Sequence, residues 1–314
     1  MSLGFQNLET KRRTLGEGTA NYSRAKGLGV ASAFSCCYSN FFEVTFGISV
    51  VSWYSTAALV RFLWDLTAER MHYKKAPITE ALIDIRVELS SELRFEDLSA
   101  FRKHVSTDYP REETRNLSQA MLLFGPSVQA SAQQQPWGFM FRNETNTQVV
   151  QVRLDGFTFS RLEPYEDFEH LRDEARRLWD IYRELVRPKK VVRIAVRYIN
   201  QLNLPGTRVE PEDYLKTFPH LSGDLPKDLR DFGPFLMNLR VPQPDLKGLL
   251  IINEAGTPPK KPETVSIILD LDLSVESPAI ESEEEMWAFF QKLRERKNLY
   301  FEACITDKTR ELIS

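Results

Sequence analysis

The chain has 314 residues, a formal net charge of −3, and apolar and charged fractions of 42% and 27%. These values are typical of an ordinary globular protein with a sizeable core. The acidic balance argues against a general polyanion-binding protein, although a local basic patch is compatible with it. The cysteines Cys36, Cys37 and Cys304 form neither a disulfide framework nor a zinc pattern, so we expect a reducing, cytoplasmic location.

Residues 1–70 differ from the rest of the chain in how charged and apolar residues are distributed. The segment 44–60 has no charged residue and reaches the lower limit of about 17 residues for a membrane span, but it contains several Ser, Thr and Gly residues. Met71 is the first internal methionine, and a well-patterned sequence begins directly after it. We therefore favour a translation start at Met71 over a membrane anchor, and expect membrane association only if 44–60 is a real span.

The patterned part of the chain predicts alternating groups of strands and helices. The segments with strand-like alternation or β-branched residues are 78–89, 128–135, 137–142, 148–162, 189–202, 235–241, 248–253 and 264–275. Apolar stripes with helical spacing predict helices over 95–105, 165–185, 211–218 and 282–304. Residues 106–127 are hard to interpret, and 119–124 fits either a helical turn or a strand.

The order of these elements repeats. Residues 71–188 read as strand, helix, three strands and long helix, and 189–314 give the same order. Since neither long helix can bury its apolar stripe alone, we expect one α+β domain. Its two β-α-β-β-β-α units would form antiparallel sheets joined edge to edge, with both helices on one side. This saddle-like or helix-grip plan is similar in outline to the TATA-binding-protein fold.

The sheet face without helices would then carry charges of both signs. In 191–200, Arg193 and Arg197 alternate with apolar residues, and Asp270 and Asp272 do the same in 264–275. We predict that these arginines and carboxylates lie within contact range on one face. The residues expected to form a ligand or partner surface are Asp84, Arg86, Arg153, Arg193, Arg197, Asn200, Asp270 and Asp272.

Asp270 and Asp272 allow two interpretations. A carboxylate pair on one strand face can hold Mg²⁺ or Mn²⁺, or share acid–base chemistry. The favoured interpretation is that both carboxylates pair with arginines on neighbouring strands. Arg193 and Arg197 likewise either clamp an anion or form a cross-strand ion ladder, and the ladder is favoured.

Other motifs give little support for catalysis. The four histidines are scattered without metal spacing, and we find neither a phosphate loop nor a dinucleotide fingerprint. The charged run 294–298 reads as a solvated helix face. We therefore assign no catalytic residue and expect no cofactor.

Four segments together carry a resemblance to a known family. They are Tyr73–Ala81, Val192–Asn200, Ile268–Asp272, and Leu293–Asn298 with the following Phe301-Glu302 and Ile305–Asp307. In their order and spacing they resemble a sporadically distributed family of uncharacterised prokaryotic proteins, over residues 71–314. The resemblance implies an accessory gene, of the kind found in defence clusters, without a known enzymatic activity.

Three functions are compatible with the sequence. The favoured one is a non-enzymatic binding or regulatory module that contacts a partner protein or small ligand through the charged sheet face. The second is a metal-dependent enzyme that acts on a phosphate-containing substrate through Asp270 and Asp272. The third is a nucleic-acid-binding saddle, which the net charge and the interleaved carboxylates disfavour.

Overall fold

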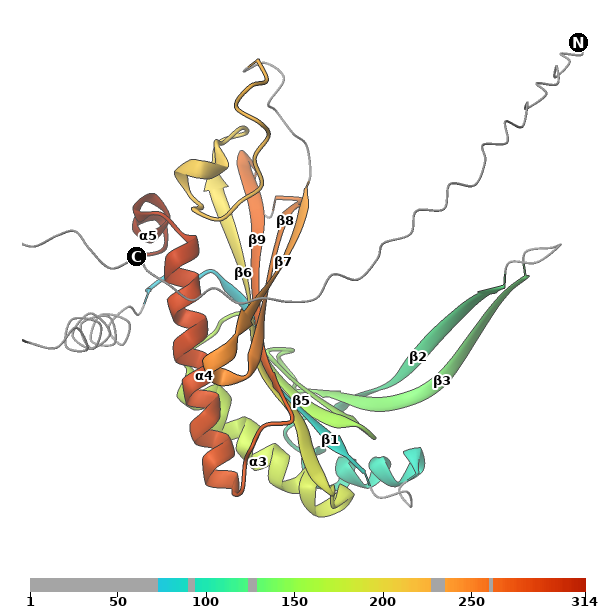
Figure 1. The fold of residues 1–314 in the computed structure, drawn as a ribbon. Helices are drawn as coiled ribbons and strands as arrows, with labels where there is room; N and C mark the ends of the chain where they lie inside the picture. The colour runs from blue at the N-terminus through green and yellow to red at the C-terminus, as the bar shows by residue number, and fades with distance from the viewer. Residues whose placement is uncertain (1–72, 90–93, 124–128, 227–234, 260–261) are drawn as a thin grey trace, which may run out of the picture. The chain divides into compact units, whose positions relative to one another are not determined.

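The computed structural model describes residues 73–89, 94–123, 129–226, 235–259 and 262–314, all of which lie in one compact unit, 53–314. They form an α+β fold in which helices pack against one antiparallel sheet (Figure 1). The predicted fold class is therefore confirmed at this level.

The sheet has nine strands in the described part of the chain. They are β1 (Ile78–Glu88), β2 (Arg111–Leu123), β3 (Gln129–Arg142), β4 (Gln148–Arg153), β5 (Gly156–Leu162), β6 (Lys190–Pro205), β7 (Leu236–Gln243), β8 (Gly248–Thr257) and β9 (Thr264–Glu276). Their order is β2-β3-β4-β5-β1-β6-β9-β8-β7. The antiparallel β1–β6 pair lies in the middle, so β5-β4-β3 on one side corresponds in order to β9-β8-β7 on the other.

The helices follow from capping and apolar spacing. They are α2 (Arg102–Val105), α3 (Phe168–Val186), α4 (Glu283–Cys304) and α5 (Asp307–Ile313), with short 3₁₀ helices at Phe95–Phe101, Pro211–Asp213 and Pro244–Leu246. Asp167 caps α3 by accepting the backbone N–H of His170 at 2.8 Å. Ser282 caps α4 in the same way, by accepting the backbone N–H of Glu285 at 3.2 Å.

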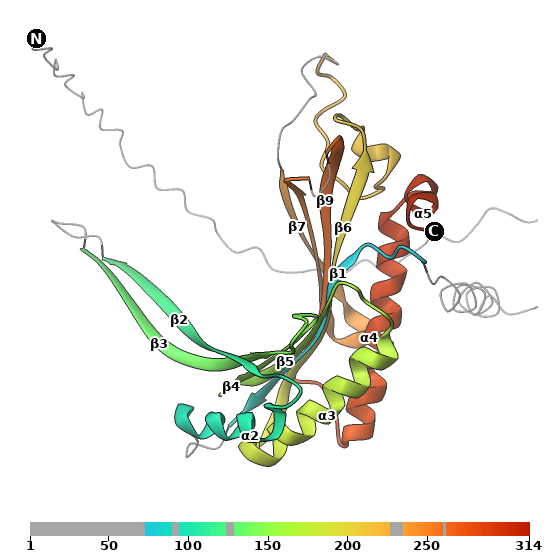
Figure 2. The same ribbon diagram turned by 180° about the vertical axis from the view of Figure 1, so that it is seen from behind.

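The core lies on one face of the sheet. The buried residues of β1, such as Ile83 and Ile85, alternate with its polar residues, and Ile194 and Val196 do the same in β6. Figures 1 and 2 show α3 and α4 against this face, where α3 packs on β1 and β5 and α4 packs on β6 and β9. We call the opposite face, against which none of these described helices packs, the helix-free face.

The strand prediction is wrong in the first half of the chain. Residues 111–123 form β2, whose last residues the sequence leaves open between helix and strand, and 129–142 form a single strand instead of two. The expected strand 148–162 is divided at Leu154 and Asp155 into β4 and β5. The first half therefore has one strand more than the predicted repeat.

Two helix predictions also need correction. Helix α3 begins at Phe168, and Tyr165 lies before it, where its hydroxyl group is 3.1 Å from that of Tyr198. The expected helix 211–218 ends after one 3₁₀ turn. Its next residues pair with the end of α4 instead, because Lys216 donates its N–H to the carbonyl of Cys304 at 2.7 Å.

The questions about the start of the chain fall outside the described residues. Neither the segment 44–60 nor Met71 is among the residues that the structure describes, so the translation start stays a prediction. Within the described ranges, no helix has the length and apolar character that a membrane crossing requires.

Candidate functional site

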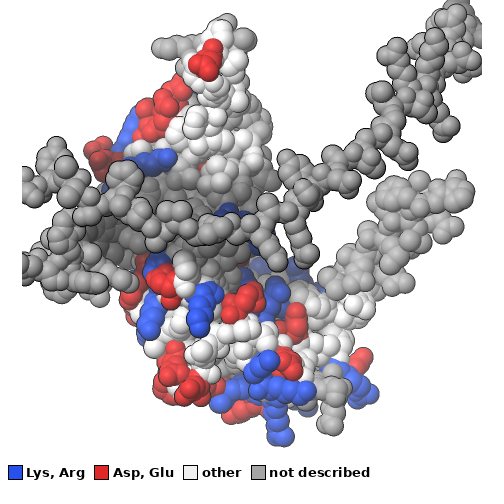
Figure 3. Space-filling view, in the orientation of Figure 1, with Lys and Arg blue, Asp and Glu red and all other residues white. Residues whose placement is uncertain are grey.

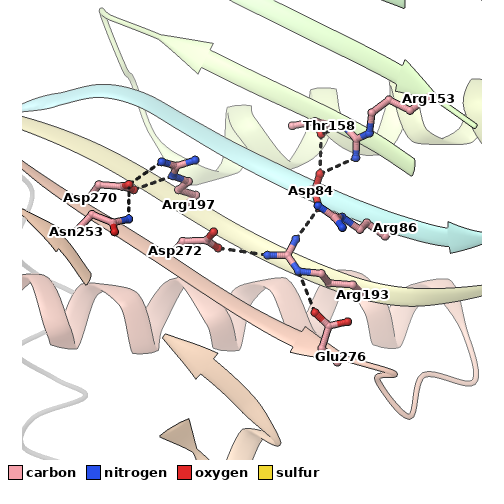
Figure 4. A network of polar contacts seen from close by, with 10 residues as sticks. All are labelled: Asp84, Arg86, Arg153, Thr158, Arg193, Arg197, Asn253, Asp270, Asp272 and Glu276. Atoms are coloured by element: carbon pink, nitrogen blue, oxygen red, sulfur yellow. Dashed lines mark hydrogen bonds and ion pairs between the residues drawn. The ribbon is translucent and has the colours of Figure 1, made fainter. Parts of the chain in front are cut away.

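The charged residues predicted on one face do come together on the helix-free face (Figure 4). Arg193 and Arg197 alternate with the buried Ile194 and Val196, so both point away from the helices. In the register of β6 and β9, Arg197 lies directly opposite Asp272. We call this set the polar network; it consists of Asp84, Arg86, Arg153, Thr158, Arg193, Arg197, Asn253, Asp270, Asp272 and Glu276.

Asp84 is the centre of the network. It lies on β1 between β5 and β6, and its carboxylate accepts hydrogen bonds from Thr158 at 2.7 Å, Arg153 at 2.9 Å and Arg193 at 2.7 Å. Its side chain is only 14% exposed. Since charge-assisted bonds of this length satisfy both carboxylate oxygens, Asp84 has little capacity left for a ligand.

Glycines make room for Arg153. Gly138 on β3 and Gly156 on β5 are its cross-strand neighbours. A Cβ atom at Gly156 would lie 2.9 Å from Nη2 of Arg153 and 2.6 Å from the carbonyl oxygen of Ile85. The guanidinium therefore lies close to the sheet backbone, 5.0 Å from the ring centroid of Trp137.

Both carboxylate oxygens of Asp270 are also occupied by hydrogen bonds. Arg197 donates to its two oxygens at 2.8 and 2.6 Å, and Asn253 donates to it at 2.9 Å. This bidentate bond is the main cause that raises the pKa of Arg197. The pair thus behaves as the predicted cross-strand ion ladder.

Asp272 is less well satisfied than its neighbour. Its Oδ1 lies 3.6 Å from Nη2 of Arg193, and this buried oxygen accepts no hydrogen bond from the described residues. Burial raises the pKa of Asp272, although Arg193 and Arg197 oppose the shift. Asp272 is therefore held by charge rather than by hydrogen bonds.

The rim of the network is open. Arg86 lies opposite Arg193 in the β1–β6 register, and its side chain is 51% exposed with a 3.7 Å contact to Asp84. Glu276 is 72% exposed and lies 3.3 Å from Arg193. These two rim charges are accessible to a second molecule.

Asn200 is the exception among the predicted site residues. It shares the alternation of Tyr198, and therefore points to the helix side, where it donates to the carbonyl of Leu269 at 3.0 Å. Its grouping with Arg193 and Arg197 is wrong. The predicted contacts among the arginines and carboxylates are confirmed.

The carboxylates of the network do not fit a metal site. Arg197 and Asn253 occupy the oxygens of Asp270, and a cation there would have to displace a guanidinium that bonds both of them. Among the residues that the structure describes, no group of three His, Cys, Asp or Glu side chains is arranged to hold a metal ion.

The sequence interpretation missed a pocket on the other face. Lys297, expected on a solvated helix face, is buried and lines a cavity of about 280 Å³. The signal was present, because Lys297 follows Leu293 by four residues and precedes Phe301 by four, which places it in the buried stripe of α4. We call this cavity the Lys297 pocket.

A comparison with known proteins adds no identity. No family model matches the chain, and a search of curated proteins finds no match. The resemblance to the sporadically distributed prokaryotic family therefore stays a prediction, as do the functions that it implies.

Proposed function

We propose that this chain is a non-enzymatic, cytoplasmic binding module that contacts a partner protein through the rim of the polar network. The observation that carries the proposal is a contrast within the polar network. The side chains at its centre are buried and paired, whereas those at its rim are exposed. Asp84, Arg153 and Arg193 are mostly buried and paired with one another, whereas Arg86 and Glu276 are largely exposed. A rigid centre that presents exposed charges favours complementary pairing with an opposite surface.

The geometry favours a protein partner over a phosphate substrate. A clamp for phosphate needs arginine donors without other partners, but both Arg193 and Arg197 are engaged by carboxylates. A metal-dependent enzyme would need free carboxylates, and Asp270 offers none.

Nucleic acid is also disfavoured. Phosphate backbones select surfaces with an excess of Lys and Arg. In the view of Figure 3, basic and acidic side chains are interspersed over the described residues. On the polar network itself each arginine lies close to a carboxylate.

The test is a charge reversal at the rim. Arg86→Glu places a carboxylate opposite the acidic side chain of the partner that Arg86 would pair with. Because the two negative charges repel each other, we expect binding to weaken about tenfold or more. The wild-type chain is cross-linked in its native host, the captured protein is identified by mass spectrometry, and its affinity for purified wild type and variant is measured.

Lys103→Glu is the matched control, because Lys103 is exposed on α2, which belongs to the helix side. It makes the same charge change and should leave affinity unaltered. Equal affinity for Arg86→Glu and wild type, with both chains folded by circular dichroism, would contradict the proposal.

We further propose that the two halves of the sheet arose by duplication. The matching order of strands about the β1–β6 pair, with one long helix after each half, supports this origin. It would relate the chain in outline to the TATA-binding-protein fold. Superposition of β1, β4, β5 and α3 on β6, β8, β9 and α4 in an experimental structure tests the idea, and a failure to align the helices would refute it.

A further inference from the structure

The Lys297 pocket lies on the helix side, away from the polar network. It is bounded by α4, by β6, by the start of α3 and by residues 73–78. Aromatic and proline side chains form much of its wall; they are Tyr73, Pro77, Pro164, Tyr165, Phe168, Tyr198 and Phe301. The cavity volume of about 280 Å³ is close to the lower end of small-molecule sites, about 300–1,000 Å³.

Lys297 is a buried lysine without an ion-pair partner among the described residues. Only 6% of the residue is exposed, and its Nζ lies 3.4 Å from the ring centroid of Tyr198. It makes no ion pair or hydrogen bond with any residue that the structure describes. Burial, and then repulsion from Arg294, lowers the pKa of Lys297 to about 7.

Arg294 adds a second positive charge to the same wall. It precedes Lys297 by about one helical turn and also lines the pocket. Its guanidinium lies 5.5 Å from the ring centroid of Phe168, and within the described part of the chain it has no carboxylate partner. Two neighbouring basic side chains thus face one cavity, and the charge of Glu302, which is paired with Arg310, only partly offsets them.

The acidic residues of the pocket are used elsewhere. Glu302 accepts a hydrogen bond from Tyr73 at 2.8 Å and another from Arg310 at 2.9 Å. The remaining acidic residues that line the cavity also have their own partners; they are Glu163, Glu166 and Asp167. The charge of Lys297 and Arg294 is therefore left for a ligand.

We propose that the Lys297 pocket binds a small aromatic carboxylate, with the carboxylate between Lys297 and Arg294 and the ring against Tyr165, because Lys297 already covers the ring of Tyr198. The hydroxyl groups of Tyr165 and Tyr198 are 3.1 Å apart and share one hydrogen bond, so the ring of Tyr165 offers mainly apolar surface. A carboxylate supplies the missing counter-charge, and a flat ring suits the aromatic walls. This site is independent of the partner surface on the helix-free face.

The experiment is calorimetric titration of the full-length chain with benzoate, and separately with inorganic phosphate, at pH 7. We expect saturable binding of benzoate. The carboxylate favours the charged form of Lys297, so binding should be accompanied by net proton uptake, measured by comparing buffers of different ionisation enthalpy.

The decisive variant is Lys297→Met, which keeps an unbranched apolar stem in the buried stripe of α4. We expect at least about tenfold weaker benzoate binding and no proton uptake. Lys292→Gln is the control, because Lys292 is exposed on the same helix and does not line the pocket. No benzoate binding, binding of phosphate alone, or unchanged binding by Lys297→Met would each overturn the proposal.

A measurement on the wild type covers the case in which Lys297→Met does not fold. Lys297 and Lys292 are acetylated with a limiting amount of an amine-reactive acetyl donor such as acetic anhydride. The acetylation rates of the two lysines are compared by mass spectrometry. Benzoate should slow the acetylation of Lys297 several-fold and leave Lys292 unchanged. Equal slowing, or none, would refute the assignment.

Discussion

Glu254 is a buried carboxylic acid that makes the stability of the fold depend on pH. Its side chain on β8 is fully buried, and neither carboxylate oxygen has a hydrogen-bond partner among the described residues. Burial raises the pKa of Glu254 to about 8 from its ordinary value of 4.5. The folded state therefore holds the proton more tightly than the unfolded chain does.

This linkage predicts that Glu254 lowers stability as the pH rises. Its contribution is fully present below about pH 4.5, falls between about pH 4.5 and 8, and is constant above that range. At about 1.4 kcal/mol per pKa unit, the loss is on the order of 5 kcal/mol. Glu254→Gln should remove this loss, and urea unfolding from pH 4 to 9 measures the difference. The exposed Glu311→Gln should follow the wild-type curve, and an unchanged slope in Glu254→Gln would refute the prediction.

At the scale of elements, Asp84 joins three strands. Arg153 at the end of β4, Thr158 on β5 and Arg193 on β6 all donate to this single carboxylate on β1. If one partner of a buried pair is removed, the other charge stays buried without compensation, which costs roughly 3–5 kcal/mol. Asp84→Ala should therefore destabilise the fold by that amount in denaturant unfolding.

Asp155→Ala is the comparison for Asp84→Ala. Asp155 also contacts Arg153, at 3.4 Å, but its side chain is 48% exposed. We expect a cost of about 1 kcal/mol or less, since exposed pairs contribute little. A similar loss in the two variants would show that burial of the network does not govern its strength.

The alternation of strands allowed much of the polar network to be predicted, because a period of two fixes which face each side chain occupies. The same rule applied strictly places Asn200 with Tyr198 on the helix side, so that error was avoidable. Strand β2 could not be predicted in this way. Residues 111–116 of this strand are all polar or charged and mostly exposed, so they show no apolar alternation.

The alternation of residues does not predict which arginine bonds which carboxylate in the polar network. Arg197 lies opposite Asp272, yet it bonds the diagonal neighbour Asp270. The choice depends on side-chain reach and on the third partner, Asn253, from another strand. The Lys297 pocket likewise needs four segments distant in sequence, so the buried lysine is visible in the sequence but its cavity is not.

For the molecule as a whole, the predicted units 71–188 and 189–314 share one sheet. The β1–β6 pair joins them, and Lys75 in the first unit donates its N–H to the carbonyl of Ile313 at 3.0 Å. The core residues of both units also belong to one continuous cluster. We therefore expect a single cooperative transition rather than two.

This cooperativity predicts that damage in the second unit loosens the first. Leu271 on β9 is fully buried, and Leu271→Ala should cost about 2–5 kcal/mol through the cavity that it leaves. Native-state hydrogen exchange then reads the backbone amides of Phe157 and Phe159 on β5. If unfolding is cooperative, their opening free energy falls as much as that of the β9 amides. Leu239→Ala on the exposed part of β7 should change neither strand. Unchanged protection of β5 in Leu271→Ala would mean that the β1–β6 pair joins two units that unfold independently.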